Sequence, residues 1–276
     1  MFKKTSPFGR KKTTAKRPFA DFYSNWIATL STTLLPQLRR ALSSFSVSPA
    51  LLSLQVDGMH HHFQSYYLAF DQAAAADVAQ CLHPEWRTSV ERPFLWLGDF
   101  HPYLFTNLLR SFLDDQDSSS QEDSGRDSFL EEYDAAAMEE FHQMRPWHVA
   151  VAWRSPSRAL TARVEQIECG LRLMVPALAA RARHAQTGLF RTVGAEWGMG
   201  AKEGGRVKEA VAEEMEELVG VVVDANRLRR SVLADVVSVT TVYQAALFFE
   251  AIAQFLVGFR DDKLLRQFEE CEMPIN

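Results

Sequence analysis

Apolar residues recur at helical spacing along nearly the whole chain, and this periodicity restricts the fold to one built from helices. The first stretch, 19–46, carries an apolar residue at every fourth position: Phe22, Trp26, Leu30, Leu34, Leu38 and Leu42. The second stretch, 50–82, repeats the spacing: Leu52, Val56, Met59, Phe63, Tyr67 and Phe70. Residues spaced in this way share one face of an α-helix, and no alternating strand pattern of useful length occurs. We therefore predict an all-α fold, a single multi-helix bundle without a sheet.

Prolines, glycines and capping residues divide the predicted domain, 18–270, into separate helices. Pro36 is expected to bend the first helix, and Ser157 to cap a helix that runs to Gln186 with a kink at Pro176. Five glycines between Gly194 and Gly205 predict a glycine-rich loop over 188–206. Shorter helices are predicted within 85–113, and longer ones over 128–148, from Val207 onward and over 226–270.

Residues 114–127 form a predicted acidic, serine-rich loop. The stretch holds six acids, four serines and one arginine, and it offers nothing apolar to bury. Ser119, Ser120 and Ser124 each have an acid three residues later, a pattern that acid-directed kinases favour. They are possible phosphorylation sites, with a plain solvated loop as the alternative.

The first seventeen residues form a basic leader, which we expect to be disordered. It contains seven cations and no acid: Lys3, Lys4, Arg10, Lys11, Lys12, Lys16 and Arg17. The whole chain has a net charge of −5, so the part after the leader carries −12. An acidic body is a poor nucleic-acid binder, and direct DNA binding is not expected. The leader could instead serve weak binding to anionic lipid, nuclear import or nucleic acid, or be a solvated tail.

Patterns typical of catalysis or metal binding do not occur. Residues 60–62 are three consecutive histidines. Consecutive residues on a helix point about 100° apart, so these side chains cannot converge on one metal ion. The glycines of 198–205 lack both the spacing and the preceding strand of a phosphate-binding loop. Three widely separated cysteines permit neither a disulfide framework nor a CxxC pair. We therefore expect no catalytic, cofactor-binding or metal-binding residues, and a protein that is not an enzyme.

An aromatic segment, WRTSVERPFLWLGDFHP over 86–102, is the most distinctive part of the sequence. It places Phe94 and Trp96 among polar residues, with Glu91 and Arg92 beside them. We expect both aromatic rings in the core and a partly buried ion pair that involves Glu91 or Arg92. The preferred interpretation is core packing rather than a ligand site.

This segment resembles the signature of the plant Delay of Germination domain, which also forms the C-terminal half of TGA-type bZIP factors. The matching positions are Trp86, Glu91, Arg92, Phe94, Trp96, Gly98 and Pro102. The resemblance extends over about 19–260, through FADFYSNWIATL, VDGMHHHFQSYYLAFDQAA and VVDANRLRRSVLADVV. One departure is Asp99, where the family pattern has a second glycine. No basic region or leucine zipper precedes the domain, which argues against a TGA-type DNA binder.

Within that family the chain is most similar to the inaperturate pollen branch. This resemblance implies a non-enzymatic plant scaffold that helps specify pollen aperture sites at plasma-membrane domains. It also implies other proteins at those domains as partners, and a location in the cytoplasm and at the membrane periphery. Two alternatives stay open: a dormancy-type or transcription-linked regulator that binds proteins in the nucleus or cytosol, and a small-ligand sensor.

Overall fold

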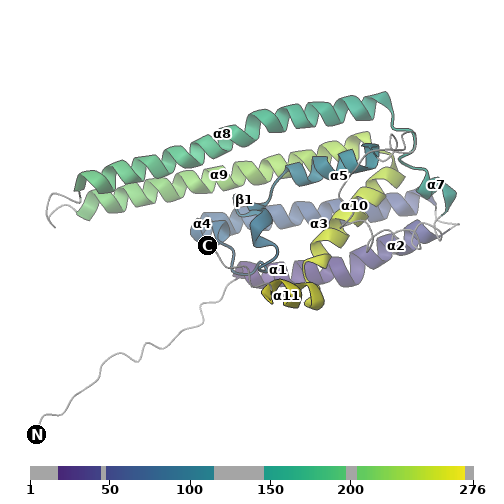
Figure 1. The fold of residues 1–276 in the computed structure, drawn as a ribbon, viewed down its shortest axis with the longest axis horizontal. Helices are drawn as coiled ribbons and strands as arrows, with labels where there is room; N and C mark the ends of the chain where they lie inside the picture. The colour runs from purple at the N-terminus through teal and green to yellow at the C-terminus, as the bar shows by residue number, and fades with distance from the viewer. Residues whose placement is uncertain (1–17, 45–47, 115–145, 197–203, 271–276) are drawn as a thin grey trace, which may run out of the picture.

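A computed structural model describes residues 18–44, 48–114, 146–196 and 204–270 (Figure 1). The predicted all-α fold is confirmed, because nearly every described residue lies in a helix or in a short link between helices. The leader, the three serines of the acidic loop and most of the predicted helix 128–148 lie outside the described residues.

The first helical stretch comprises α1 (Pro18–Thr29), a five-residue π-helix (Leu30–Leu34) and α2 (Leu35–Ser43). Pro36 has no backbone N–H to donate to the carbonyl of Thr32, so regular α geometry cannot continue through this point. The predicted disturbance at Pro36 therefore takes the form of a wider π segment immediately before the proline.

Helix α3 (Pro49–Ala76) is the central element of the body. The side chain of Ser48 accepts a hydrogen bond from the backbone N–H of Leu51, and Pro49 occupies the first turn, where a proline is tolerated. The helix packs against α1, α2, the short α4 (Val78–Leu82), α9 and α10. Its apolar face supplies the centre of the core: Leu52, Val56, Met59, Phe63, Tyr66, Tyr67, Phe70 and Ala74.

Two long antiparallel helices form a layer over this body (Figure 1). They are α8 (Arg158–Glu196) and α9 (Gly204–Val239). The predicted N-cap is confirmed, since the Ser157 hydroxyl accepts from the N–H of Leu160 at 3.1 Å. The distal part of the pair extends past α4 (Figure 1), and we define residues 180–196 and 204–214 as the arm. The predicted loop 188–206 is wrong at both ends, because α8 continues to Glu196 and α9 begins at Gly204.

The remaining elements close the bundle. A 3₁₀ turn (Arg92–Phe94) leads into a two-stranded antiparallel hairpin, β1 (Leu95–Trp96) and β2 (Asp99–Phe100). This hairpin contradicts the prediction that the domain has no sheet. It is followed by α5 (Tyr103–Asp114), α7 (Trp147–Ala150), α10 (Val242–Gly258) and α11 (Asp262–Glu269). A capping box of Thr241 and Gln244 begins α10, most of which is buried.

Candidate functional site

The hairpin brings the signature segment into the centre of the body. Residues Leu97 and Gly98 connect β1 to β2 with φ values of 49° and 85°, as a two-residue hairpin turn of the primed type requires. A Cβ atom on Gly98 would stand 2.6 Å from the carbonyl oxygen of Cys81 and 3.0 Å from Cζ of Phe70. Both the backbone conformation and the close approach to α4 therefore require glycine at this position.

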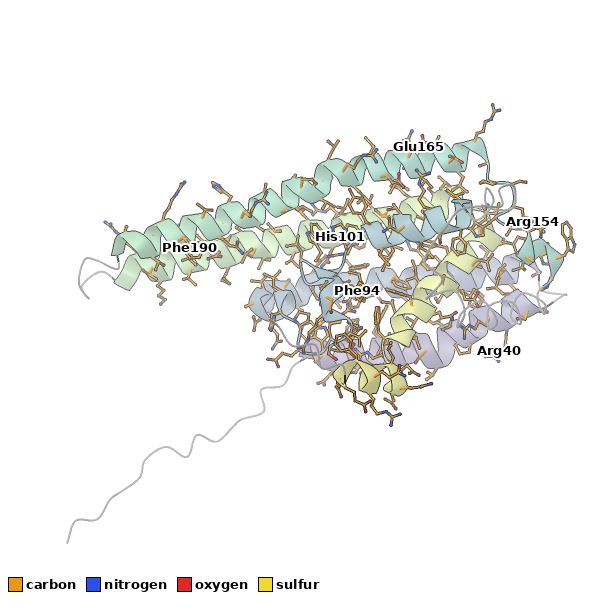
Figure 2. All side chains as sticks on the ribbon, in the orientation of Figure 1. Arg40, Phe94, His101, Arg154, Glu165 and Phe190 are labelled. Atoms are coloured by element: carbon orange, nitrogen blue, oxygen red, sulfur yellow. The ribbon has the colours of Figure 1, made fainter. Side chains whose placement is uncertain are left out.

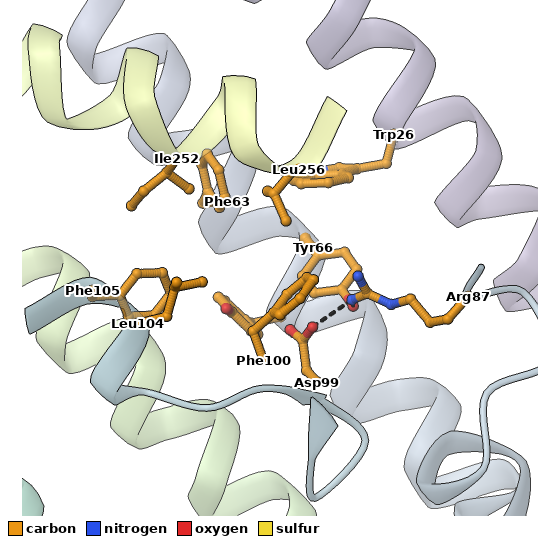
Figure 3. Close-up of a pocket in the computed structure, with 11 residues that line it drawn as sticks. Trp26, Phe63, Tyr66, Arg87, Asp99, Phe100, Leu104, Phe105, Ile252 and Leu256 are labelled. Carbon is orange, nitrogen blue, oxygen red and sulfur yellow. Dashed lines mark hydrogen bonds and ion pairs between the residues drawn. The ribbon is translucent and has the colours of Figure 1, made fainter. Parts of the chain in front are cut away.

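Arg87 lies at the centre of a buried polar network. Its Nη1 atom donates to the hydroxyl of Tyr23 at 3.0 Å and to Oε1 of Glu91 at 3.2 Å. Its Nη2 atom donates to the hydroxyl of Tyr66 at 2.7 Å and to Oδ1 of Asp99 (Figure 3). Burial lowers the pKa of a guanidinium, but these surrounding groups raise the pKa of Arg87 well above its ordinary value. The arginine is thus held as a cation inside the core.

Glu91 is fully buried and accepts three hydrogen bonds, with an ion pair to Arg260 beside them. Its carboxylate accepts from the hydroxyl of Tyr23 at 2.8 Å and from the backbone N–H of Thr88 at 2.6 Å. Arg87 and Arg260, the latter at 3.6 Å, supply its ion pairs. Burial, together with the neighbouring carboxylate, raises the pKa of Tyr23 to about 12. The site consequently joins α1, the signature segment and the end of α10.

Arg229 of α9 ties the hairpin to the long helices. Its guanidinium donates to the backbone carbonyl oxygens of Trp96, of Asp99 at 3.2 Å and of Phe100 at 2.8 Å. It also donates to Oδ1 of Asn226 at 2.7 Å. These bonds satisfy carbonyl groups that so short a hairpin cannot pair by itself. Register and position of the hairpin therefore depend on a residue about 130 positions later in the chain.

The network continues onto α3 through Asp71. Its Oδ1 accepts from the Asn226 amide at 2.8 Å, and its Oδ2 pairs with Arg230 at 3.2 Å. Half-burial raises the pKa of Asp71, and the hydrogen bond from Asn226 opposes that shift. A continuous set of polar contacts thus runs from Tyr23 of α1 through the hairpin and α9 to Asp71 of α3.

A cavity of about 20 Å³ adjoins the Arg87 guanidinium. Its lining combines the polar atoms of Tyr66, Tyr67, Arg87 and Asp99 with apolar groups such as Trp26 and Leu256 (Figure 3). The volume suffices for about one water molecule and is far below the roughly 300–1,000 Å³ of small-molecule sites. This cavity is therefore too small for a cofactor or a metabolite.

The predicted signature residues lie at three different depths in the structure. Glu91, Gly98 and Pro102 are buried, while Trp86 and Trp96 are half-buried. Phe94 is 52% exposed and Trp96 is only half-buried, so placing these two rings in the core was wrong. The expected ion pair that involves Glu91 or Arg92 is confirmed through Glu91, which pairs with Arg87, while Arg92 is exposed. The 3₁₀ turn points the side chains of Arg92 and Phe94 outward, and the Phe94 ring contacts Phe259 at the surface. Phe100, at 4% exposed, occupies the core instead.

Several residues of the network were not identified from the sequence as site residues: Tyr23, Tyr66, Asp71, Arg87, Asp99 and Arg229. Asp99 did stand out as a departure from the family pattern. Two features of the sequence could have identified residues of this network. A charged residue at an otherwise apolar helical position needs a partner, and Asp99 replaces a residue that has no side chain.

Other predicted sites fall outside this region. The seven leader cations and the three serines of the acidic loop lie outside the described residues. In 18–44, 48–114, 146–196 and 204–270, no group of three or more histidine, cysteine, aspartate or glutamate side chains is arranged to hold a metal ion. His62 of the histidine run stacks on Trp26 with ring centroids 4.7 Å apart.

No single described helix is long and apolar enough to cross a membrane. Among the described helices, only α10 and α11 taken together, across a 51° bend, have the required length and composition.

Comparison with known proteins identifies the family. A family model named DOG1, described as seed dormancy control, matches residues 34–111. Transcription factor TGA7 of Arabidopsis thaliana is 34% identical over 33% of this chain and 24% of its own length. Protein INAPERTURATE POLLEN1 of Arabidopsis thaliana is 42% identical over 97% of this chain and 98% of its own length. A homolog of INAPERTURATE POLLEN 1 from Oryza sativa subsp. japonica is 35% identical over 95% of this chain and 93% of its own length. The chain belongs to the inaperturate pollen branch of the DOG1-domain family.

Proposed function

We propose that this protein is a non-enzymatic scaffold that helps specify pollen aperture sites at plasma-membrane domains. The observation that carries the proposal is similarity over nearly the full length to two proteins named for inaperturate pollen. Similarity to a TGA factor covers only a third of the chain, so a DNA-bound role has less support.

The chemistry of the core supports a non-enzymatic role. Arg87, Glu91 and Asp99 would be the strongest candidates for acid–base or anion-binding chemistry, but they bind one another and are at most 3% exposed. A catalytic group must reach a substrate, and the adjoining cavity offers about 20 Å³. The same volume disfavours a small-ligand sensor built on this cavity.

Membrane association is proposed to involve the leader. Each of its seven cations can contribute about 1 kcal/mol near an anionic leaflet before screening by salt. The acidic body opposes this attraction, so we expect binding through the leader to be weak, reversible and salt-sensitive. Recruitment to a defined patch then requires a protein partner as well, because lipid charge is spread over the whole membrane.

Imaging a tagged protein in tetrad-stage pollen tests the proposal. We expect patches at the plasma membrane, which disperse when Arg10, Lys11, Lys12, Lys16 and Arg17 are changed together to Gln. As a control with the same change in charge, five exposed body arginines become Gln: Arg40, Arg154, Arg158, Arg172 and Arg227. Patches that persist without the leader cations would remove the leader from the proposal. An exclusively nuclear or diffuse cytosolic signal would favour the dormancy-type regulator.

A further inference from the structure

The arm exposes one large aromatic side chain among unpaired cations. Phe190 is 79% exposed and lies near the free end of α8 (Figure 2). Arg183 and Arg191 on the same part of the helix are exposed and form no ion pair with any residue that the structure describes. Residues 169–195 of α8 contain four arginines and no acid, although the chain after the leader is acidic. The arm thus presents a phenyl ring on a basic helix.

A groove of about 450 Å³ lies at the base of the arm, where α9 passes the junction of α3 and α4. Its apolar lining includes Ala75, Val78, Met215 and Val219. Asp77 and Glu216 line the same groove and are exposed. Further out along α9, Glu209 and Glu213 are also exposed. The groove is therefore apolar inside and acidic at its rim.

The exposed Phe190 with its neighbouring arginines matches the groove in polarity and in charge. An aromatic ring flanked by arginines fits an apolar groove edged by carboxylates, and aromatic and arginine residues are the usual anchors of protein interfaces. We propose that two copies of this chain associate through their arms, with Phe190 of each copy seated in the groove of the other. Arg183 and Arg191 then face the carboxylates of the partner's groove and of its α9.

The position of Phe190 along the arm is set by the pairing of α8 with α9. Arg181 of α8 pairs with Glu217 of α9, which places residue 181 level with the groove. Phe190 therefore lies about 13 Å further out along the helix, at 1.5 Å per residue. In the proposed dimer the two arms run antiparallel, so that each Phe190 meets the groove of the other copy across a single two-fold axis. Such an interface is closed, as in most homodimers.

Sedimentation velocity over a micromolar concentration series tests the proposal. We expect the full-length protein to form dimers, and Phe190→Asp to weaken dimerisation at least about tenfold, as loss of an anchor residue does. Ala75→Trp, which fills the groove from an exposed helical position, should have the same effect. Leu54→Asp changes a residue that is 63% exposed on α3 and should leave dimerisation unchanged. Circular dichroism verifies that each variant keeps its fold.

Mixing the two defective variants gives the sharpest result. Phe190→Asp retains an intact groove and Ala75→Trp an intact aromatic ring, so a mixture can form one complete contact per pair. We expect heterodimers in the mixture and monomers in each variant alone. A wild-type protein that stays monomeric, undiminished dimers of Phe190→Asp, a mixture without heterodimers, or open assemblies larger than two copies would each overturn the proposal.

Discussion

Arg87 and Asp99 form an ion pair in which each side chain is only 2% exposed. Removing two charges from water costs several kcal/mol per ion, and the pair is tolerated only when further hydrogen bonds satisfy both groups. Arg87 also donates to Tyr23, Tyr66 and Glu91, although its Nε has no hydrogen-bond partner among the described residues. Tyr67 and Asp99 line the same small cavity beside the guanidinium. The signature segment therefore acts first as the internal junction of the fold.

Asp99→Asn removes the negative charge while keeping the shape of the side chain. It leaves the Arg87 cation with one carboxylate in the core, and loss of one partner of a buried pair costs about 3–5 kcal/mol. We expect a loss of unfolding free energy near the lower end of that range, measured by urea denaturation. Asp235→Asn breaks the more exposed pair with Arg163 and should cost at most about 1 kcal/mol. Equal effects of the two changes would contradict a special role for the buried pair.

Gly98→Ala should destabilise the protein by about 2 kcal/mol or more. The added Cβ meets the Cys81 carbonyl, and a positive φ costs a non-glycine residue about 1–2 kcal/mol. Gly170→Ala provides the opposite control, since nothing lies within 4 Å of its Cβ position in α8. That change should stabilise the protein by up to about 1 kcal/mol. Thermal melting of both variants measures these opposite changes in stability. A Gly98→Ala variant as stable as the wild type would show that the turn is not constrained.

The two phenylalanines that flank the hairpin should respond differently to truncation. Phe100→Ala empties a core position and is expected to cost about 3–5 kcal/mol. Phe94→Ala removes a half-exposed ring, with an expected cost below about 1 kcal/mol. Urea denaturation of the two variants measures both losses of unfolding free energy. A large cost at Phe94 would mean that its contact with Phe259 is part of the core.

Acid should weaken the fold through half-buried histidines. Burial lowers the pKa of His62 below its ordinary value of 6.5, and burial together with Arg229 does the same for His101. Their folded-state pKa values lie below the unfolded ones, so the unfolded chain binds more protons as the pH falls. The free energy of unfolding should therefore decrease below about pH 6.5, by at most about 1.4 kcal/mol per pH unit for each histidine.

Denaturation at pH 8, 7, 6 and 5.5 tests this sign. His62→Gln should flatten the decrease, whereas His61→Gln, at an exposed position, should not. Stability that rises toward pH 5.5 would contradict the lowered pKa values of these half-buried histidines.

The first helical stretch and α3 were predictable because each buries an apolar face, which imposes its period on the sequence. Ser157 could be identified as a cap for an equally local reason, since a hydroxyl before the first turn satisfies a free N–H. The extension of α8 to Glu196 was missed because the five glycines between Gly194 and Gly205 suggested a loop. Packing of α8 against α9 outweighs the low helix propensity of Gly188 and Gly194, which lie within the helix.

The hairpin and the polar network could not be derived in this way. Each strand has two residues, too few for a recognisable alternation, and Arg229 fixes the hairpin from a distant helix. Whether Phe94 or Phe100 enters the core depends on the direction of the turn at Leu97 and Gly98. Interactions between distant segments thus determine the site, while local periodicity determines the helices.

The most direct test of the proposed function is complementation of Arabidopsis thaliana plants that lack INAPERTURATE POLLEN1. The chain would be expressed from the promoter of that relative, and apertures counted on mature pollen by microscopy. If this protein specifies aperture sites, apertures should reappear on most grains. Pollen that still lacks apertures, although the protein accumulates in tetrads to the level of the native relative, would contradict the proposed function.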